Sequence, residues 1–279
     1  MLALPALGAP VRAAAVPRVA SLDYGLGETL IAIGRPPVAL PDLEGWRKWV
    51  VAPPLPPGVV DLGLDLAPNM EVLSALSPDL ILSTDYVAGA EPALRRIAPV
   101  ERLTLYGPGL DPLEAARTAL SRLGDRLGAR AAAARYLEDT EAFFEAGRAR
   151  AARLSPGPIL LASLLDARHA RVYGASGLYG KVLARLGIAN AWAAPDNYWG
   201  FATVGIEAFW QTEATRLVTF DPLPPDAMGA LARSPIWTAL PFARQGAVSV
   251  LEPSLMFGGL PSARRFAALL LGELERRSA

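Results

Sequence analysis

The sequence predicts an α/β protein made of two lobes that are joined by one long, rigid α-helix. Two stretches of the chain, residues 16–128 and 155–279, each alternate short apolar runs with helical segments, a pattern typical of parallel α/β sheets. Between them, residues 129–154 contain no proline and one glycine, which predicts a single helix about 39 Å long. Because the 279 residues are 52% hydrophobic and 19% charged, the chain can bury a sizeable core.

The first stretch is expected to form the N-terminal lobe. Its first strand is expected within residues 17–23, and a helix that ends at Gly34 follows. A proline-rich section, residues 36–57, comes next and is expected to be loop-like. Asn69 then has the side chain to cap a short helix, and the apolar run Leu80–Ser83 predicts a buried strand.

The second stretch is expected to mirror the first. Residues 155–158, Ser-Pro-Gly-Pro, stop the long helix, after which strands and helices are expected at residues 159–164, 171–173, 178–186, 216–220 and 263–276. We therefore divide the chain into an N-terminal lobe (16–128), a linking helix (129–154) and a C-terminal lobe (155–279). A helical link resists the opening that loop hinges permit, so this plan suggests a rigid receptor with its ligand in the cleft.

Charge and residue usage exclude several function classes. Lys+Arg and Asp+Glu each number 27, and the sequence has no basic stripe, so we expect no nucleic-acid partner. The absence of cysteine excludes disulfides, thiolate metal sites and thiol catalysis. His169 is the only histidine, and we expect it to have a surface or structural role. We therefore expect neither a metal site nor a cofactor.

Catalysis is the competing function class. The segment around Ser176 lacks the glycine spacing of a nucleophile elbow, and no phosphate-binding or dinucleotide-binding glycine motif follows a strand. Asp166, His169 and Ser176 are the residue types of a hydrolytic triad, but they lie too close together in the sequence to favour one. We expect a binding protein and not an enzyme, and a hydrolase is the less favoured alternative.

The N-terminus carries a separate signal. Residues 1–15 are apolar and end in three alanines, which suit signal-peptidase cleavage, but they lack the positive region that begins a signal peptide. Two interpretations stay open: a signal remnant whose true start lies upstream, or an apolar tail. No later segment has the roughly 18 uninterrupted apolar residues that span a bilayer.

A series of short segments carries a resemblance to a known class. In chain order they are 47–50 (RKWV), 53–56 (PPLP), 61–64 (DLGL), 68–69 (PN), 96–99 (RIAP), 164–169 (LLDARH), 187–192 (GIANAW), 197–200 (NYWG), 235–242 (PIWTALPF) and 258–263 (GGLPSA). Over residues 17–270 the chain resembles the periplasmic binding proteins that serve siderophore, haem and cobalamin importers. Within that class it is most similar to the ferric-hydroxamate binders.

The resemblance implies a cleft lined by aromatic side chains from both lobes. Trp49 and Tyr86 match ligand-contacting positions of the N-terminal lobe, and Trp199 matches one of the C-terminal lobe. Such side chains suit a ferric chelate, whose organic shell surrounds polar iron-bound oxygens. Indole faces cover the shell, and a phenol donates a hydrogen bond to an oxygen.

The sequence departs from the hydroxamate binders at three positions of this cleft. Asp65 stands where they carry an arginine that reaches the iron-bound oxygens, and Leu255 and Phe257 replace a tryptophan and a tyrosine. The cleft is therefore expected to be less basic and less polar, which disfavours highly anionic tris-catecholates. We expect a neutral or cationic ferric hydroxamate, with Asp65 pairing with a pendant amine. Alternatively, Asp65 faces solvent or an adjacent arginine.

The resemblance also implies partners and a location. Glu71 and Glu207 match the glutamates, one on each lobe, that dock on the permease of an ABC importer, whose ATPase supplies the energy. We expect a soluble monomer in the periplasm of a Gram-negative cell. It would have no lipid anchor, because no cysteine is present to carry one. A catecholate siderophore, cobalamin or haem stays open as an alternative cargo.

Overall fold

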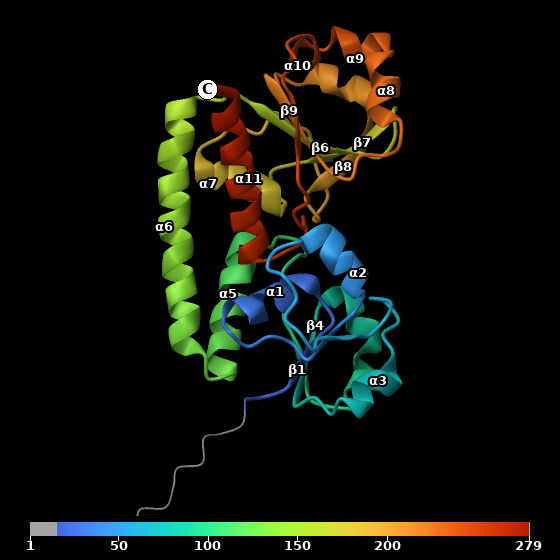
Figure 1. The fold of residues 1–279 in the computed structure, drawn as a ribbon, viewed down its shortest axis with the longest axis vertical. Helices are drawn as coiled ribbons and strands as arrows, with labels where there is room; N and C mark the ends of the chain where they lie inside the picture. The colour runs from blue at the N-terminus through green and yellow to red at the C-terminus, as the bar shows by residue number, and fades with distance from the viewer. Residues whose placement is uncertain (1–15, 279) are drawn as a thin grey trace, which may run out of the picture.

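The computed structural model describes residues 16–278, so the expected signal remnant, residues 1–15, lies outside the described part. The structure confirms the predicted fold class. Two α/β lobes, each built around a five-stranded sheet, lie toward opposite ends of a long helix (Figure 1). Within the described range, no helix has both the length and the apolar character that crossing a membrane requires.

The N-terminal lobe contains the following elements: β1 (Val19–Ser21), α1 (Tyr24–Ala32), β2 (Ala39–Leu40), α2 (Leu43–Gly45), the π-helical turn η1 (Trp46–Val50), β3 (Val60–Asp61), α3 (Met70–Ala75), β4 (Leu80–Ser83), the 3-10 helix η2 (Asp85–Ala90), α4 (Glu91–Leu94), β5 (Val100–Arg102) and α5 (Pro112–Arg126). Its sheet is parallel throughout, in the order β3-β2-β1-β4-β5. The central strands β1 and β4 are buried along their whole length, which explains why they are apolar runs without alternation.

Side-chain caps set where the helices of this lobe begin. Asn69 accepts hydrogen bonds from the backbone N–H groups of Glu71 and Val72, so it caps α3 as the sequence predicts. Asp23 caps α1 in the same way, and Asp111 caps α5. The proline-rich section differs from expectation: it contains the helical turns α2 and η1, because Trp46 and Val50 are buried in a small core of their own.

The C-terminal lobe contains β6 (Ile159–Leu164), β7 (His169–Tyr173), α7 (Leu178–Leu186), β8 (Phe201–Gly205), η3 (Ile206–Gln211), β9 (Arg216–Phe220), α8 (Ala227–Ala232), α9 (Pro235–Ala239), α10 (Pro241–Arg244), β10 (Val248–Leu251) and α11 (Leu260–Ser278). Its sheet has the order β10-β9-β6-β7-β8 and is mixed, so this half does not mirror the first. Strands β6, β9 and β10 are parallel, whereas β7 runs antiparallel to both neighbours. The link between β6 and β7 is too short for a crossover, which forces a hairpin.

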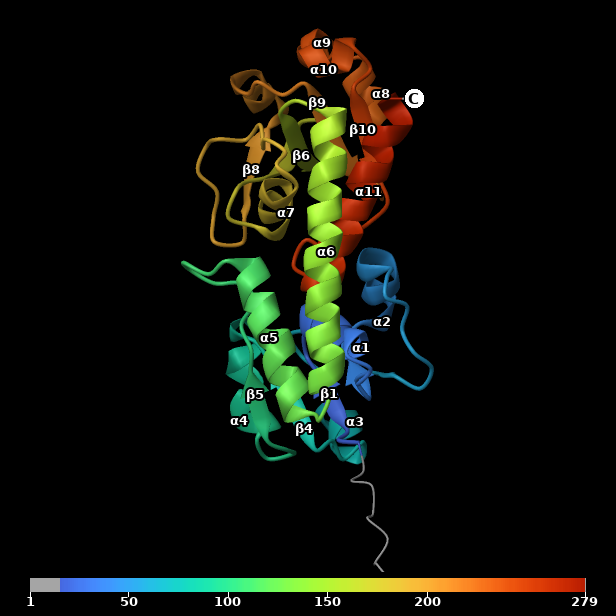
Figure 2. The same ribbon diagram turned by 90° about the vertical axis from the view of Figure 1, so that its left-hand side faces the viewer.

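The long helix α6 (Arg130–Leu154) runs along one side of both lobes, and the closing helix α11 lies alongside its C-terminal half (Figures 1 and 2). Near the C-terminal end of both helices, the guanidinium of Arg150 donates two hydrogen bonds of 2.8 Å to Glu275. One hydrophobic core continues across the junction, and it contains Leu26 of α1, Phe144 of α6 and Phe266 of α11. The lobes therefore share a packed core along this side, which resists opening.

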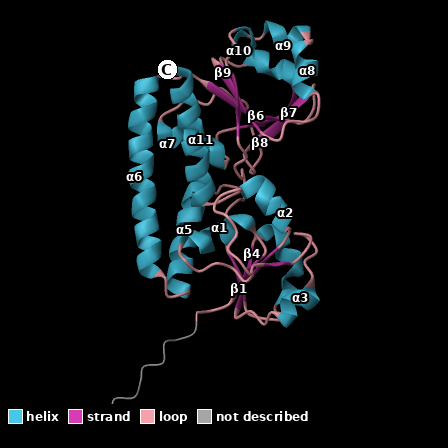
Figure 3. Cartoon of the chain, in the orientation of Figure 1, coloured by secondary structure: helices cyan, strands magenta, loops and turns pink. Residues whose placement is uncertain are grey.

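Figure 3 shows the helices surrounding two separate groups of strands, with loops between the lobes where the strands of both sheets end. In parallel sheets, the loops that follow the carboxyl ends of the strands are the usual place for ligands. The loops after β4, β5 and β10 are therefore expected to carry a ligand site.

Candidate functional site

A cluster of aromatic rings joins the lobes, with Trp199 at its centre. We call Tyr86, Tyr106, Tyr198, Trp199, Phe201 and Phe257 the interlobe aromatic cluster. The ring centre of Trp199 lies 5.3 Å from that of Phe257, 6.1 Å from that of Tyr86 and 6.3 Å from that of Tyr106. Tyr86 and Tyr106 follow the neighbouring parallel strands β4 and β5, and Phe257 follows β10. The cluster therefore forms where the strand ends of the two sheets face each other.

Tyr106 connects the lobes directly. Its O–H donates to the carbonyl oxygen of Gly258 at 2.6 Å, and the carbonyl of Met256 lies 3.3 Å away. Burial raises the pKa of this phenol well above its ordinary value, so the proton that makes the hydrogen bond is retained. Sequence reasoning missed Tyr106, because the strand before it, β5, is Val-Glu-Arg and carries no apolar run that would indicate a strand.

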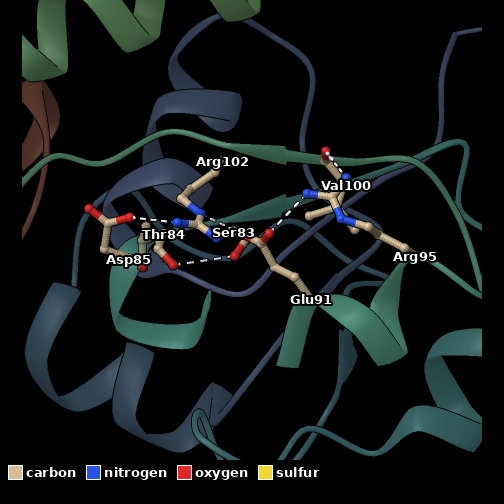
Figure 4. A network of polar contacts seen from close by, with 7 residues as sticks. All are labelled: Ser83, Thr84, Asp85, Glu91, Arg95, Val100 and Arg102. Atoms are coloured by element: carbon tan, nitrogen blue, oxygen red, sulfur yellow. Dashed lines mark hydrogen bonds and ion pairs between the residues drawn. The ribbon is translucent and has the colours of Figure 1, made fainter. Parts of the chain in front are cut away.

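Tyr86 lies on η2, which an ion-pair network holds in place (Figure 4). The guanidinium of Arg102 contacts Asp85 at 3.1 Å and the buried Glu91 at 2.7 Å. Arg95 contacts the same Glu91 at 2.9 Å. The hydrogen bond from Arg102 is the main reason that the pKa of Glu91 is lowered to about 2, so this carboxylate stays charged. The network fixes the backbone beside Tyr86, whose own side chain is 54% exposed.

A tight turn sets the position of Trp199. The Oδ1 atom of Asn197 accepts hydrogen bonds from the backbone N–H of Trp199 at 3.0 Å and of Phe201 at 3.3 Å. Gly200 has φ of +81°, and a Cβ there would collide with the backbone of Gly177, so only glycine fits. The preceding Tyr198 packs its ring 4.8 Å from that of Trp199. The indole is therefore held by its own loop as well as by its neighbours.

Trp49 lies apart from this cluster. It is on the turn η1 and is 43% exposed, and the Nζ atom of Lys48 lies 4.6 Å from its ring centre. Among the described residues, no ring of the cluster contacts it. Leu255 packs against the small core formed by the same turn, whereas Phe257 lies in the cluster. The structure thus brings Tyr86, Trp199 and Phe257 together and leaves Trp49 at a different place on the N-terminal lobe.

A cavity of about 440 Å³ lies under the proline-rich loop near this turn. The residues that line it include Trp46, Val51, residues 54–57 and Val59, with Arg47 as the charged member. None of the residues of the interlobe aromatic cluster lines it.

Asp65 is exposed on the N-terminal lobe and forms no ion pair with a described residue. Its Oδ1 accepts a hydrogen bond of 2.8 Å from the backbone N–H of Leu66. Burial first, and then the carboxylates of Asp42, Asp65 and Asp61, raise the pKa of Tyr24 well above its ordinary value. The charges of these three acids therefore act on one phenol, and no arginine among residues 16–278 forms an ion pair with Asp65.

A buried carboxylate joins the lobes beneath the cluster. Glu28 of α1 accepts hydrogen bonds from the backbone N–H of Gly259 at 2.5 Å, the N–H of Ser262 at 3.2 Å and the Ser262 hydroxyl at 2.7 Å. It thus caps the first turn of α11, where a helix favours negative charge. Burial outweighs these bonds and raises its pKa to about 7, and burial likewise raises the pKa of Asp23 to about 6.

Glu71 and Glu207 are both exposed. Glu71 is in the first turn of α3 in the N-terminal lobe, and Glu207 is in η3 in the C-terminal lobe. Neither forms an ion pair with a residue that the structure describes. Glu71 and Glu207 thus each present a carboxylate that no described residue pairs with.

The triad expected for a hydrolase does not form. Asp166 lies in the hairpin turn between β6 and β7 and accepts backbone hydrogen bonds from Arg168 and His169, and its Oδ2 lies 2.9 Å from Nδ1 of His169 at the start of β7. Ser176 instead donates to Asp196 at 2.7 Å. Across residues 16–278, no group of three or more histidine, aspartate and glutamate side chains is arranged to hold a metal ion.

Known proteins with similar sequences and structures identify the family of this chain. A family model described as "Periplasmic binding protein" matches residues 18–255. The iron(3+)-hydroxamate-binding protein FhuD of Escherichia coli (strain K12) is 32% identical over 253 residues, which are 91% of this chain and 85% of that one. The Fe3+-Desferal-bound siderophore binding protein FhuD from Vibrio cholerae superposes with a TM-score of 0.87 at 27% identity, over 93% of this chain and 98% of that one. The petrobactin-binding protein YclQ from Bacillus subtilis shares the fold, with a TM-score of 0.76 at 18% identity, over 93% of this chain and 92% of that one.

Proposed function

The chain belongs to the periplasmic binding protein family, and from this premise we propose that it captures a ferric hydroxamate siderophore between its lobes for an ABC importer. The observation that carries the proposal is the interlobe aromatic cluster, in which Tyr86 and Tyr106 of one lobe meet Trp199 and Phe257 of the other. Two relatives support the cargo, because their names specify a ferric hydroxamate and the ferric complex of Desferal.

The rings divide the recognition of a ferric chelate between them. Trp199 offers an indole face to the organic shell, and Phe257 extends the apolar surface. Tyr86 is exposed and has a free hydroxyl, so it is the phenol that donates to a chelate oxygen, whereas the hydroxyl of Tyr106 is already used within the protein. Trp49 lies on the neighbouring N-terminal turn, and Leu255 of the C-terminal lobe packs against the core of that turn, so both contact only the edge of a large ligand.

The charge on the N-terminal lobe bears on the choice among hydroxamates. Asp65 has one carboxylate oxygen bonded to the backbone and no neutralising partner among the described residues, so it favours a cationic chelate and repels an anionic one. Ferrioxamine B, a ferric trihydroxamate with a pendant ammonium group, fits this charge. Catecholate chelates, cobalamin and haem are the alternative cargoes of the same fold.

Delivery follows capture. The loaded protein, a monomer of the periplasm, docks through Glu71 and Glu207 on the two halves of an inner-membrane permease, whose ATPase supplies the energy. Surface glutamates without intramolecular partners suit this role, because such charges set orientation and encounter rate more than affinity. We take residues 16–128, 129–154 and 155–279 as the two lobes and the helix between them.

Isothermal titration with a ligand panel tests the proposal. The panel contains ferrichrome, ferrioxamine B, coprogen, their iron-free forms, a ferric tris-catecholate, cobalamin and haem. We expect sub-micromolar binding of at least one ferric hydroxamate, which Trp199→Ala removes. Trp210→Ala is the matched control, because Trp210 is also a partly exposed tryptophan of the C-terminal lobe and lies outside the cluster. Binding of a control compound in place of every hydroxamate would overturn the cargo and leave the fold untouched.

A further inference from the structure

Arg171 is a cation on the C-terminal side of the interlobe aromatic cluster. It lies on β7, where Ala170 and Val172 point into the core of the lobe and Arg171 points to the opposite sheet face. Its guanidinium carbon lies 4.4 Å from the ring centre of Phe201, and its Nη1 lies 3.6 Å from the sulfur of Met256. Sequence reasoning did not single out this residue.

Most of the hydrogen-bonding capacity of Arg171 is unused among the described residues, because its one side-chain acceptor is the sulfur of Met256. Its Nε is fully enclosed and has no acceptor, and no carboxylate of the described residues pairs with the guanidinium. Methionine sulfur is only a weak acceptor, and a ring face accepts none of the in-plane donors. Buried polar groups in folded proteins nearly always have hydrogen-bond partners. The unpartnered donors of this guanidinium are therefore free to bind a ligand.

The neighbours of Arg171 are also neighbours of the candidate site. Phe201, which stacks on the guanidinium, lies 6.3 Å from Phe257, and Phe257 lies 5.3 Å from Trp199. Met256, which contacts Nη1, also gives its carbonyl to the hydroxyl of Tyr106. The cation thus packs on Phe201 and Met256, and two residues, Phe201 and Phe257, lie between it and the indole of Trp199.

The opposite side of the junction carries the opposite charge. Asp65, Asp42 and Asp61 gather around Tyr24 on the N-terminal lobe, and Leu255 packs against the core that contains Tyr24. Asp61 uses both carboxylate oxygens to hold backbone N–H groups, whereas Asp42 and Asp65 each use only Oδ1, so Asp65 keeps one oxygen for a ligand. A ligand between the lobes would therefore meet a carboxylate on one side and a guanidinium on the other.

We propose that Arg171 is the specificity-determining donor of the C-terminal lobe, binding the iron-bound oxygens of the chelate, while Asp65 faces any ammonium group on the chelate's other side. The proposal rests on the proposed function and adds the orientation of the ligand. A guanidinium presents a planar fork of N–H donors, which suits two oxygens that are held next to each other on one metal ion. The cleft then selects chelates that have one oxygen-rich face and no negative charge on the opposite face.

Titration calorimetry with a matched pair of ligands tests this orientation. The probes are ferrioxamine B and its N-acetylated form, which have the same iron centre but differ in the ammonium group. We expect Arg171→Met to weaken both ligands by about 10- to 100-fold, because hydrogen bonds to charged groups contribute on the order of 1.5–3 kcal/mol. We expect Asp65→Asn to weaken ferrioxamine B alone, by about 3- to 10-fold.

Two further variants separate binding from folding. Arg216→Met is the control, because Arg216 also has enclosed nitrogens without partners. Arg216 lies at the start of β9, and Phe220, at the other end of this strand, packs in the shared core. Arg171→Lys keeps the charge and loses the fork, so we expect it to fold and to bind about 3- to 10-fold more weakly than the unaltered protein.

The outcomes distinguish this proposal from the proposed function. If the unaltered protein binds no hydroxamate, the proposed function fails. If it binds ferrioxamine B and Arg171→Met, folded by circular dichroism, binds it equally well, the role of Arg171 is overturned and the function stands. If Arg171→Lys binds both ligands as tightly as the unaltered protein does, the role of the guanidinium fork is contradicted. Loss of the N-acetylated ligand in Asp65→Asn would contradict the orientation.

Discussion

The two lobes meet at the junction with different chemistry and different geometry. The N-terminal lobe contributes residues from loops that follow parallel strands: Tyr86 after β4 and Tyr106 after β5. The C-terminal lobe contributes side chains from a sheet face, because β7 and β8 are antiparallel and place Arg171 and Phe201 on the same side. Loops at the edge of a sheet tolerate substitution of single residues. A sheet face, in contrast, holds its side chains in a register that the strand pairing fixes.

The same contrast holds for charge. The N-terminal side is acidic, with Glu28 buried beneath the cluster and Asp65 exposed. The C-terminal side provides rings, one cation and the backbone N–H groups that bind Glu28. The N-terminal lobe therefore supplies carboxylates, and the C-terminal lobe supplies the groups that can bind them.

The largest effect is expected at Glu28, the carboxylate that the two lobes share. Glu28→Ala leaves two backbone N–H groups and the Ser262 hydroxyl without their acceptor in a buried place, which should lower the free energy of unfolding by roughly 3 kcal/mol. Urea denaturation measures the loss. Asp111→Ala, which removes an ordinary cap from α5, is the comparison and should cost about 1 kcal/mol. Equal losses would contradict the special role of the shared carboxylate.

Two buried carboxylates of the N-terminal lobe should respond to pH in opposite directions. The pKa of Glu28 is raised to about 7, so its contribution to stability is fully present below about pH 4.5 and is lost as the pH rises through 7. The pKa of Glu91 is lowered to about 2, so its contribution is present above about pH 4.5 and is lost as the pH falls through 2.

Unfolding free energies from pH 2 to 8 check this contrast. The difference between the unaltered protein and Glu28→Gln should change mainly between pH 4.5 and 7, whereas the difference for Glu91→Gln should change mainly below pH 4.5. Because Asp23 also has a raised pKa, only these differences, and not the raw profile, isolate Glu28. If the difference in unfolding free energy between the unaltered protein and Glu28→Gln stays constant from pH 4.5 to 7, the predicted titration of Glu28 is contradicted.

The two sides should contribute unequally to binding. Trp199 contacts four other rings and is fixed by its turn, so we expect Trp199→Ala to weaken a ferric hydroxamate by at least about 100-fold. Tyr86 has one ring contact and is mostly exposed, so Tyr86→Ala should cost about 10-fold. Titration calorimetry measures the siderophore affinity of each variant. A larger loss of affinity in Tyr86→Ala than in Trp199→Ala would show that the N-terminal loop contributes more to binding.

A smaller effect is expected at Tyr106, whose hydroxyl links the lobes. Tyr106→Phe removes the hydrogen bond to Gly258 and keeps the ring beside Trp199, so stability should fall by about 1 kcal/mol while affinity changes little. Thermal unfolding and titration of the same preparation check both halves. A large loss of affinity with unchanged stability would instead make the hydroxyl a ligand donor.

The smallest effect concerns the outer surfaces. Glu71→Gln and Glu207→Gln should each slow association with the permease by about 3-fold and leave siderophore binding unchanged, because exposed charges act mainly on encounter. Association rates on permease-containing nanodiscs test this, with Glu213→Gln, another exposed glutamate of the C-terminal lobe, as the control. Rates that are equal for all three variants would speak against docking through Glu71 and Glu207.

Local elements were predictable because their signals are local. The apolar run Leu80–Ser83, the helix Leu178–Leu186 and the strand Arg216–Phe220 have the bounds that the sequence indicates, and α6 begins one residue after the expected position. The absence of proline and the breaking segment at 155–158 suffice for the long helix. The aromatic residues Tyr86, Trp199 and Phe257 were also singled out, through the resemblance.

Only the tertiary structure decided which of these side chains meet. The hydrogen bond from Tyr106 to Gly258 joins residues 152 positions apart, and the contact of Arg171 with Met256 spans 85 positions, so no periodicity in the sequence indicates them. The antiparallel direction of β7 depends on the short turn at Asp166, and the helical turn that carries Trp49 depends on the burial of Trp46. A sequence pattern records the burial and conformation of a single segment, whereas a site requires segments from two sheets to pack together.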